Sequence, residues 1–220
     1  RQMCIRDSCA NSSAFLNPTV SPGGGTYSWS HGLGAGSSVS VSPSSTTTYT
    51  LVYEEPGGCK DTVTSTVTVN AQPTVSIIDA TTCDGECVTL SSSVSPGGGG
   101  YSWLPGYQST PNINVCPSST TTYTLIYADP GTSCTDTAFG TVTVNSSPNI
   151  TIGDYSICSG ETATLSADGY SGVGSYQWDP GGLTGNPVNV TPGSTTTYSV
   201  TFTLNGCSDT EETTVTVTPA

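Results

Sequence analysis

Short runs of Val, Thr, Tyr and Ile, in which apolar residues alternate with hydroxyl residues, extend along the whole chain. This period of two indicates β-strands, and the Gly, Pro and Ser clusters between the runs indicate turns. No stretch carries a helical period long enough to predict a helix. In the middle third the pattern predicts six strands: Pro73 to Ile78, Val88 to Leu90, Tyr101 to Leu104, Ile113 to Val115, Tyr123 to Tyr127 and Thr141 to Val144.

Three unlike landmarks recur at one spacing, so the chain consists of three copies of one unit. Trp29, Trp103 and Trp178 follow one another at intervals of 74 and 75 residues. The run Ser-Thr-Thr-Thr-Tyr, ending at Tyr49, Tyr123 and Tyr198, keeps the same intervals, and each copy closes on Thr-Val-Thr-Val. The predicted organisation is a doubtful N-terminal segment 1–8 followed by repeats at 9–71, 72–146 and 147–220.

Six or seven short antiparallel strands in about 75 residues predict a small immunoglobulin-like β-sandwich, so the expected fold class is all-β, with three such sandwiches in tandem. The repeated Trp and Tyr residues are the predicted core anchors, with each Trp on the inner face of the third strand. The linkers, residues 70–72 and 145–147, each end at a Pro. Because such short linkers are stiff, we expect the repeats to stack as a semi-rigid rod.

Nine cysteines in a chain this poor in charge indicate disulfides in an oxidising compartment. One pair recurs in every copy, which predicts the bridges Cys9–Cys59, Cys83–Cys134 and Cys158–Cys207 at one end of each sandwich. Such a bridge closes a loop of about fifty residues and contributes roughly 4 kcal/mol in the chain-entropy model. A fourth bridge, Cys87–Cys116, is predicted for the middle repeat because the other copies carry Ser or Thr at both of its positions.

The octapeptide Arg1 to Ser8 has no counterpart before Cys83 or Cys158, and it contains the ninth cysteine, Cys4. It resembles a translated sequencing adapter; the alternative is a genuine N-terminus with a free or intermolecular thiol. The first repeat is also expected to lack the strand with which the others begin, Pro73 to Asp79 and Pro148 to Asp154. Two explanations stay open, a fragment of a longer array and a strand donated by a neighbouring subunit.

The charge balance excludes nucleic acid as a partner, since 16 acidic residues face only 3 basic ones. Charged residues are 9% of the chain, against roughly 25% in an average soluble protein. An enzyme is not expected, because His31 stands alone and has no repeated partner. No cofactor is expected either. Asp84-Gly85-Glu86 and Glu54-Glu55 could offer oxygens to calcium, but the spaced acidic loop of a calcium site is missing.

Sugars could keep such an uncharged surface soluble. Four sequons are formal N-glycosylation acceptors, at Asn11, Asn145, Asn149 and Asn189. Two further candidates, Thr62 and Thr137, lie in Asp-Thr-aliphatic triplets that resemble the O-glycosylation acceptor of gliding-type bacteria. The third repeat departs from that triplet, with Glu211 after Thr210.

The combined pattern of Cys, Gly-Glu, Leu, Trp, Ser-Thr-Thr-Thr-Tyr, Cys and Thr-Val-Thr-Val resembles the immunoglobulin-like or PKD-like repeats of large bacterial cell-surface adhesins and gliding-motility-associated proteins. The resemblance covers Cys9 to Pro219 and implies an extracellular structural repeat, a segment of a bacterial surface fibre or adhesin stalk; whether it forms filaments stays open at this point. Its partners would be neighbouring repeats or identical subunits. The family's sorting domain and leader are not seen in the sequence, which favours a fragment.

No transmembrane run occurs, so direct membrane insertion is not expected. The alternative function is a carbohydrate-binding module, in which loop aromatics such as Tyr107 and Tyr170 stack on sugar rings.

Overall fold

The computed structural model describes residues 6–21, 23–170 and 173–219, and Cys4 with the rest of residues 1–5 lies outside this part. Over the described residues the chain is all-β; its helical structure there is one 3-10 turn, η1 (Ser30–Gly32). By internal packing the chain divides into two compact units. One contains Arg1–Ile77, Ser91–Pro111 and Tyr123–Phe139, and the other contains Ile78–Leu90, Asn112–Thr122 and Gly140–Ala220.

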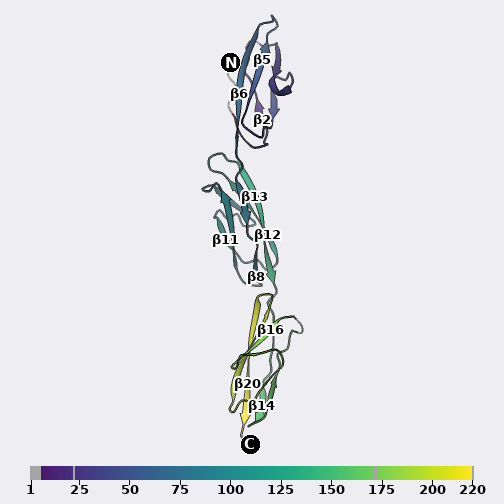
Figure 1. Cartoon of the computed structure of the whole chain (residues 1–220), viewed down its shortest axis with the longest axis vertical. Coiled ribbons are helices and arrows are strands. Elements are labelled where there is room, and N and C mark those ends of the chain that lie inside the picture. The colour runs from purple at the N-terminus through teal and green to yellow at the C-terminus, as the bar shows by residue number, and fades with distance from the viewer. Residues whose placement is uncertain (1–5, 22, 171–172, 220) are drawn as a thin grey trace. The chain divides into compact units, whose positions relative to one another are not determined.

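The first repeat contains two sheets, one with the order β1-β6-β5-β3 and one with the order β2-β4. Leu16, Trp29, Val41, Leu51 and Val67 form its buried core, which both sheets supply. Its strands are β1 (Arg6–Cys9), β2 (Ala14–Leu16), β3 (Thr26–Trp29), β4 (Val39–Val41), β5 (Thr47–Glu54) and β6 (Lys60–Asn70) (Figure 1).

The middle repeat has the sheets β10-β12-β13-β8 and β11-β9-β7. All six strands predicted for it are present, which confirms the interpretation of the alternating pattern. Their bounds are β7 (Thr74–Ile77), β8 (Ala80–Cys83), β9 (Val88–Ser95), β10 (Gly100–Leu104), β11 (Asn112–Val115), β12 (Thr121–Ala128) and β13 (Thr135–Asn145). The additional strand is β8, which the sequence pattern did not separate from β7.

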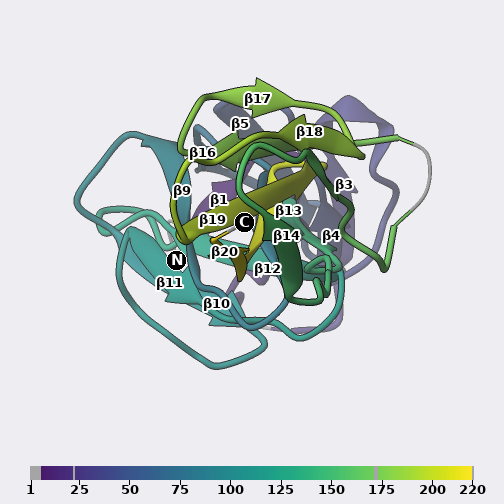
Figure 2. The ribbon, with the colours of Figure 1, turned by 90° about the horizontal axis from the view of Figure 1, so that it is seen from below.

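The third repeat has a five-stranded sheet, β14-β20-β19-β16-β17, and the pair β15-β18. Trp178, Leu165, Val200, Phe202 and Val215 form the centre of its core. The strands are β14 (Tyr155–Cys158), β15 (Ala163–Leu165), β16 (Ser175–Asp179), β17 (Leu183–Thr184), β18 (Val188–Val190), β19 (Thr196–Leu204) and β20 (Cys207–Thr218). Figure 2 shows β14 beside β20, with β19 next to them.

The repeated Trp residues are buried core anchors, as predicted, with exposed fractions of 5% for Trp29 and 0% for Trp103 and Trp178. Each indole N–H donates to the backbone carbonyl seven residues later, at Gly36, Thr110 and Gly185. This bond satisfies the one polar atom of the ring, so the ring is buried without an unpaired donor. Truncating such a side chain to Ala costs about 3–5 kcal/mol.

The repeated Tyr residues are buried as well, with exposed fractions of 5% for Tyr49 and 7% for Tyr123 and Tyr198. The prediction that they belong to the core is therefore confirmed.

One edge strand in each repeat is parallel to its neighbour, which differs from the expected fully antiparallel sheets. β1 pairs with β6, β8 with β13 and β14 with β20. In all three repeats the edge strand ends at a cysteine, and this cysteine lies opposite the final residue of the last strand: Cys9 opposite Asn70, Cys83 opposite Asn145 and Cys158 opposite Thr218.

Arg6–Cys9 is a strand before Cys9, and it occupies the place that β8 and β14 occupy in the other repeats. The strand expected to be missing from the first repeat is the counterpart of β7, which would precede residue 6 and so falls outside the described residues. The segment therefore has a structural counterpart in the other repeats although its residues differ from theirs. The predicted strand Pro148 to Asp154 is reduced to a single bridge between Thr151 and Asp168.

Candidate functional site: the cysteine joints and a tyrosine-lined pocket

Two disulfides connect successive repeats. Cys9 of the first repeat is bonded to Cys134 of the middle repeat, and Cys83 of the middle repeat is bonded to Cys207 of the third. The predicted bridges Cys9–Cys59, Cys83–Cys134 and Cys158–Cys207 are therefore wrong, and Cys59 and Cys158 are free and exposed. We call each of these two inter-repeat bridges, with its surroundings, a joint.

The physical reason lies in the last strand of each repeat. In the first repeat, Cys59 precedes the start of the 11-residue strand β6, and Cys9 lies opposite Asn70 at the other end of that strand. Eleven residues of strand span about 35 Å, whereas bridged Cα atoms lie roughly 4.4–6.8 Å apart. The two cysteines of one repeat therefore cannot meet. The observed bridges have Cα–Cα distances of 5.6 and 5.7 Å.

Polar side chains accompany both bridges. Asn145 donates its side-chain amide to the backbone carbonyl of Asn205 at 2.8 Å, two residues before Cys207. Gln72 donates its side-chain amide to the carbonyl of Thr135 at 3.2 Å, directly after Cys134. In each joint a linker amide thus contacts the backbone beside the second cysteine, so the linker residues take part in holding the repeats.

One cysteine of each repeat lies at the hairpin that leads into the last strand, and we call it the second cysteine of that repeat: Cys59, Cys134 and Cys207. A residue with left-handed backbone conformation precedes it every time: Gly58 (φ 84°), Ser133 (φ 58°) and Gly206 (φ 86°). In the middle repeat Asp129 shapes this hairpin by accepting hydrogen bonds from the hydroxyl and N–H of Thr132 and from the N–H of Gly131. These bonds favour the charged carboxylate, the Thr132 hydroxyl most of all, and they lower the pKa of Asp129.

The bridge Cys87–Cys116 is present, as predicted. The prediction rested on the other repeats, which carry Ser or Thr at both of its positions. It lies within the middle repeat and has a sequence separation of 29 residues, against 125 and 124 for the joints. It therefore does not connect one repeat to another.

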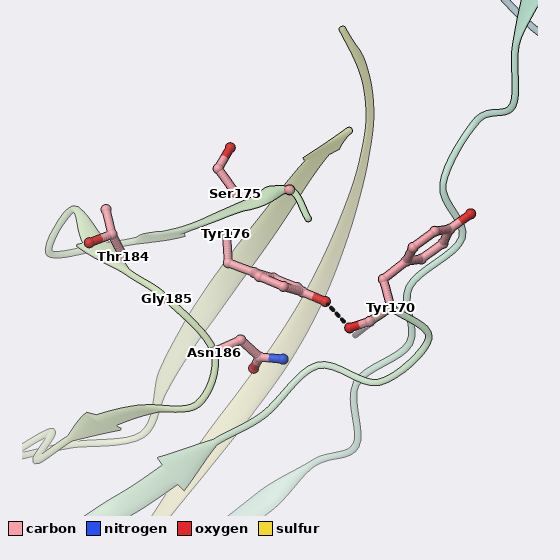
Figure 3. Close-up of a pocket in the computed structure, with 7 residues that line it drawn as sticks. Tyr170, Ser175, Tyr176, Thr184, Gly185 and Asn186 are labelled. Carbon is pink, nitrogen blue, oxygen red and sulfur yellow. Dashed lines mark hydrogen bonds between the residues drawn. The ribbon is translucent and has the colours of Figure 1, made fainter. Parts of the chain in front are cut away.

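A pocket of about 580 Å³ opens in the third repeat. It is lined by Tyr170, Gly174, Ser175, Tyr176, Thr184, Gly185 and Asn186 (Figure 3). Tyr176 donates its hydroxyl to the carbonyl of Tyr170 at 2.8 Å. Both rings contact Phe202, with centroid distances of 4.5 Å for Tyr176 and 5.2 Å for Tyr170. Asn186 is held by hydrogen bonds to and from the backbone of Ala167. The pocket combines two aromatic rings with hydroxyl and amide groups.

Of the two tyrosines predicted for sugar stacking, only Tyr170 belongs to this pocket. Tyr107 has an exposed fraction of 82% and a left-handed φ of 51°, with its backbone N–H bonded to Trp103. Sequence reasoning did not find Tyr176, because its signal is the stacking on Phe202 from the neighbouring strand.

The candidate glycosylation residues fall into two groups. Asn11, Asn149, Asn189, Thr62 and Thr137 are exposed, whereas Asn145 is half-buried and its amide is used in the joint. Asn189 also accepts a hydrogen bond from Thr164. The N–H of Thr62 and of Thr137 is bonded to the carboxylate of the preceding Asp, so both acceptor triplets adopt the same local structure.

The remaining candidates are dispersed. His31 is exposed, with its Nδ1 against the Ser30 hydroxyl and its ring 5.2 Å from that of Tyr49. Glu54 forms an exposed ion pair with Lys60 at 3.3 Å. Within residues 6–21, 23–170 and 173–219, no three His, Cys, Asp or Glu side chains gather as a metal site. The same part of the chain contains no helix long and apolar enough to cross a membrane.

The fold defines the class of protein, a tandem array of immunoglobulin-like β-sandwiches cross-linked by disulfides. No protein-family model matches the sequence, and no curated protein matches it. Solved structures with a similar fold include several that are 11 to 15% identical to this chain. They include three N-terminal domains of the highly immunogenic outer capsid protein of bacteriophage RB49 (14% identity, TM-score 0.45, covering 99% of this chain and 98% of that one).

Two others are an I-band fragment of titin (11%, TM-score 0.43, covering 99% and 98%) and extracellular domains 3–5 of Drosophila OTK (11%, TM-score 0.42, covering 99% and 96%).

Trypsin provides a direct test of the joint between the first two repeats. After Arg6 the only remaining cleavage site is Lys60, whose side chain is exposed. Cleavage in denaturant, with free thiols alkylated first, should leave the fragment 7–60 bonded to the fragment 61–220 through Cys9–Cys134. A non-reducing gel should show one band, and added reductant should separate the two fragments.

The Cys9→Ser variant is the matched control, because its fragment 7–60 should separate without reductant. Release of that fragment from the unsubstituted chain without reductant would show that Cys9 is not bonded to Cys134.

Proposed function

We propose that this chain is a structural segment of an extracellular bacterial surface fibre or adhesin stalk, whose role is to keep successive sandwiches together. The observation that carries the proposal is the pair of joints, Cys9–Cys134 and Cys83–Cys207. A binding domain needs bridges only within itself, whereas a stalk under load needs its successive repeats held to one another. Three disulfides also indicate an oxidising, extracellular setting.

The two joints interleave along the chain, and this limits extension. The shortest covalent path from Cys9 to Cys207 uses all three bridges and only the chain between Cys116 and Cys134 and between Cys83 and Cys87, about 22 residues. If either joint is reduced, the path lengthens to about 73 residues, because the other joint still shortens the chain. Each joint therefore limits extension by itself, and the two together limit it more strongly.

Surface chemistry supports an extracellular role. Neighbouring strands place Thr hydroxyls opposite one another in every repeat: Thr48 with Thr66, Thr122 with Thr141 and Thr197 with Thr214, at 2.9 to 3.4 Å. Such exposed hydroxyl rows provide a polar surface without charge. Glycans on Thr62 and Thr137 would extend the same polar surface.

Single-molecule stretching tests the mechanical role. With all three bridges intact, the unfolded part between Cys9 and Cys207 should extend to only about 22 residues of chain, roughly 90 Å with the bridges, against about 198 residues and roughly 690 Å after reduction. The Cys87→Ser/Cys116→Ser variant is the matched control for the path, because it keeps both joints and should lengthen the oxidised extension only to about 51 residues, roughly 190 Å. Changing all four joint cysteines to serine should give about 169 residues, roughly 600 Å, without reductant, because only Cys87–Cys116 remains. Equal extension of the oxidised and reduced chains would contradict the proposal.

Intact-mass measurement on protein from its natural source tests glycosylation. We expect a mass above the 22.3 kDa of the polypeptide, and loss of one glycan mass in each of the variants Thr62→Ala and Thr137→Ala. Thr210 is the matched control, since Asp209 bonds its N–H at 3.0 Å in the same way but Glu211 replaces the aliphatic residue. A native mass equal to that of the bare chain would exclude glycosylation.

The pocket of the third repeat favours a second candidate function, carbohydrate binding. We expect a glycan-array signal to be lost in Tyr170→Ala, which removes a stacking surface, and weakened in Thr184→Val, which keeps the shape of the side chain and removes a hydroxyl. Tyr107→Ala should leave the signal intact; loss of binding in that variant alone would place the sugar on the middle repeat instead. Absence of any glycan signal from the unsubstituted chain would remove this candidate.

A further inference from the structure

Cys59 and Cys158 are the two halves of a joint that is not closed within the chain. Each joint bonds the first cysteine of one repeat to the second cysteine of the repeat that follows. Under this rule, Cys59 of the first repeat needs a preceding repeat and Cys158 of the third needs a following one. Both cysteines are free and exposed.

The backbone around Cys158 matches that around the bonded first cysteines. Each ends a parallel edge strand in the same register, as described above. The carbonyls of Cys9, Cys83 and Cys158 each accept a hydrogen bond from the N–H three residues later, at 3.0, 3.0 and 3.1 Å. A left-handed residue follows two positions after each cysteine, at Asn11, Gly85 and Gly160. Cys158 therefore has the local structure of a joint cysteine.

The backbone around Cys59 matches that around the bonded second cysteines in the same way. Gly58, with φ 84°, precedes it as Ser133 precedes Cys134 and Gly206 precedes Cys207. The N–H of Glu55 donates to the carbonyl of Cys59 at 2.9 Å, as that of Asp129 donates to the carbonyl of Cys134 at 2.8 Å. The hairpin thus holds Cys59 in place without a partner repeat.

Burial separates the bonded second cysteines from the free one. Cys134 and Cys207 have exposed fractions of 0% and 1%, whereas Cys59 is exposed in an equivalent hairpin. Cysteine is among the residue types most often found buried. A joint explains this difference in burial. The hairpins of Cys134 and Cys207 are covered by a bridge and by a linker amide, whereas the hairpin of Cys59 has no bridge.

We propose that chains of this protein join end to end through a disulfide between Cys158 of one copy and Cys59 of a second copy. This rests on the proposed structural function and names its partner as a further copy of the same chain. The oxidant is a small disulfide of the glutathione type. One thiolate attacks it and releases one reduced thiol; the second cysteine then displaces the other, so two protein thiols and one small disulfide give one protein disulfide and two small thiols.

The end joint would differ in one respect from the joint between the second and third repeats. Thr218 stands where Asn145 stands in the middle repeat, and its hydroxyl donates to the carbonyl of Ile157 at 3.2 Å. A linker amide like that of Asn145 is therefore missing at this position. The link between copies should depend on the disulfide and should come apart completely under reductant.

The experiment uses the full chain with Cys4→Ser, so that the thiol of Cys4 adds no links. Treatment with a mixture of oxidised and reduced glutathione should give a ladder with steps of 22.3 kDa on a non-reducing gel. The ladder should be lost in Cys59→Ser and in Cys158→Ser, whereas an equal mixture of these two variants should give a single dimer. Mass spectrometry of that dimer should find the peptide of Cys59 bonded to that of Cys158.

Dimers that form as readily from either variant alone as from the mixture would overturn the proposal, because they would show random oxidation of exposed thiols. A chain that stays monomeric while both thiols remain reactive to a small label would overturn it too. Mass spectrometry of the same samples after proteolysis also shows whether Cys9–Cys134 and Cys83–Cys207 have formed. If those bridges are present without a ladder, only the end joint fails; if they are absent, the proposed function fails as well.

Discussion

The long last strand of each repeat is the constraint on which the covalent structure depends. β6 and β13 each contain 11 residues, and β20 contains 12. Each keeps the hairpin cysteine at one end and the edge-strand cysteine at the other. Since a disulfide cannot span this length, each cysteine can only bond to a different repeat. The long strand therefore prevents these cysteines from bonding within one sandwich and leaves them to bond between sandwiches.

Bridges over such long separations act strongly on the unfolded chain. In the chain-entropy model a bridge that closes about 125 residues contributes close to 5 kcal/mol, somewhat more than one closing about fifty. The two loops overlap between Cys83 and Cys134, so their effects do not simply add. The joints thus stabilise the repeats and connect them at the same time, which matters for sandwiches of about 75 residues with small cores.

The sequence repeat was sufficient to predict the fold, the core and the bridge Cys87–Cys116, but not the pairing of the cysteines that recur in every repeat. Trp103 and Tyr123 were identified because three copies preserve both the residue and its spacing. The edge strands β1, β8 and β14 have no such signal, because they share little beyond their final cysteine. Because the parallel register of these strands is not evident from the sequence, Cys9 and Cys59 were predicted to lie at the same end of a sandwich. The pocket was missed for a different reason. The ring pair of Tyr176 and Phe202 has counterparts in Tyr27–Tyr53 and Tyr101–Tyr127 and therefore looks like core, and it is the packing of Tyr170 on Phe202 that adds the second ring.

The same register gives each joint a direction. A repeat uses its edge-strand cysteine toward the repeat that follows and its hairpin cysteine toward the one that precedes, so the two bonded surfaces are different. Contacts of this heterologous kind leave an unused surface at each end of any finite row, and they end only if the row closes into a ring. A two-fold contact, by contrast, would use one surface on both partners and would stop at a pair. The joint is therefore a contact that permits indefinite addition of repeats, and hydroxyl rows such as Thr48 with Thr66 supply each added repeat with its own polar surface.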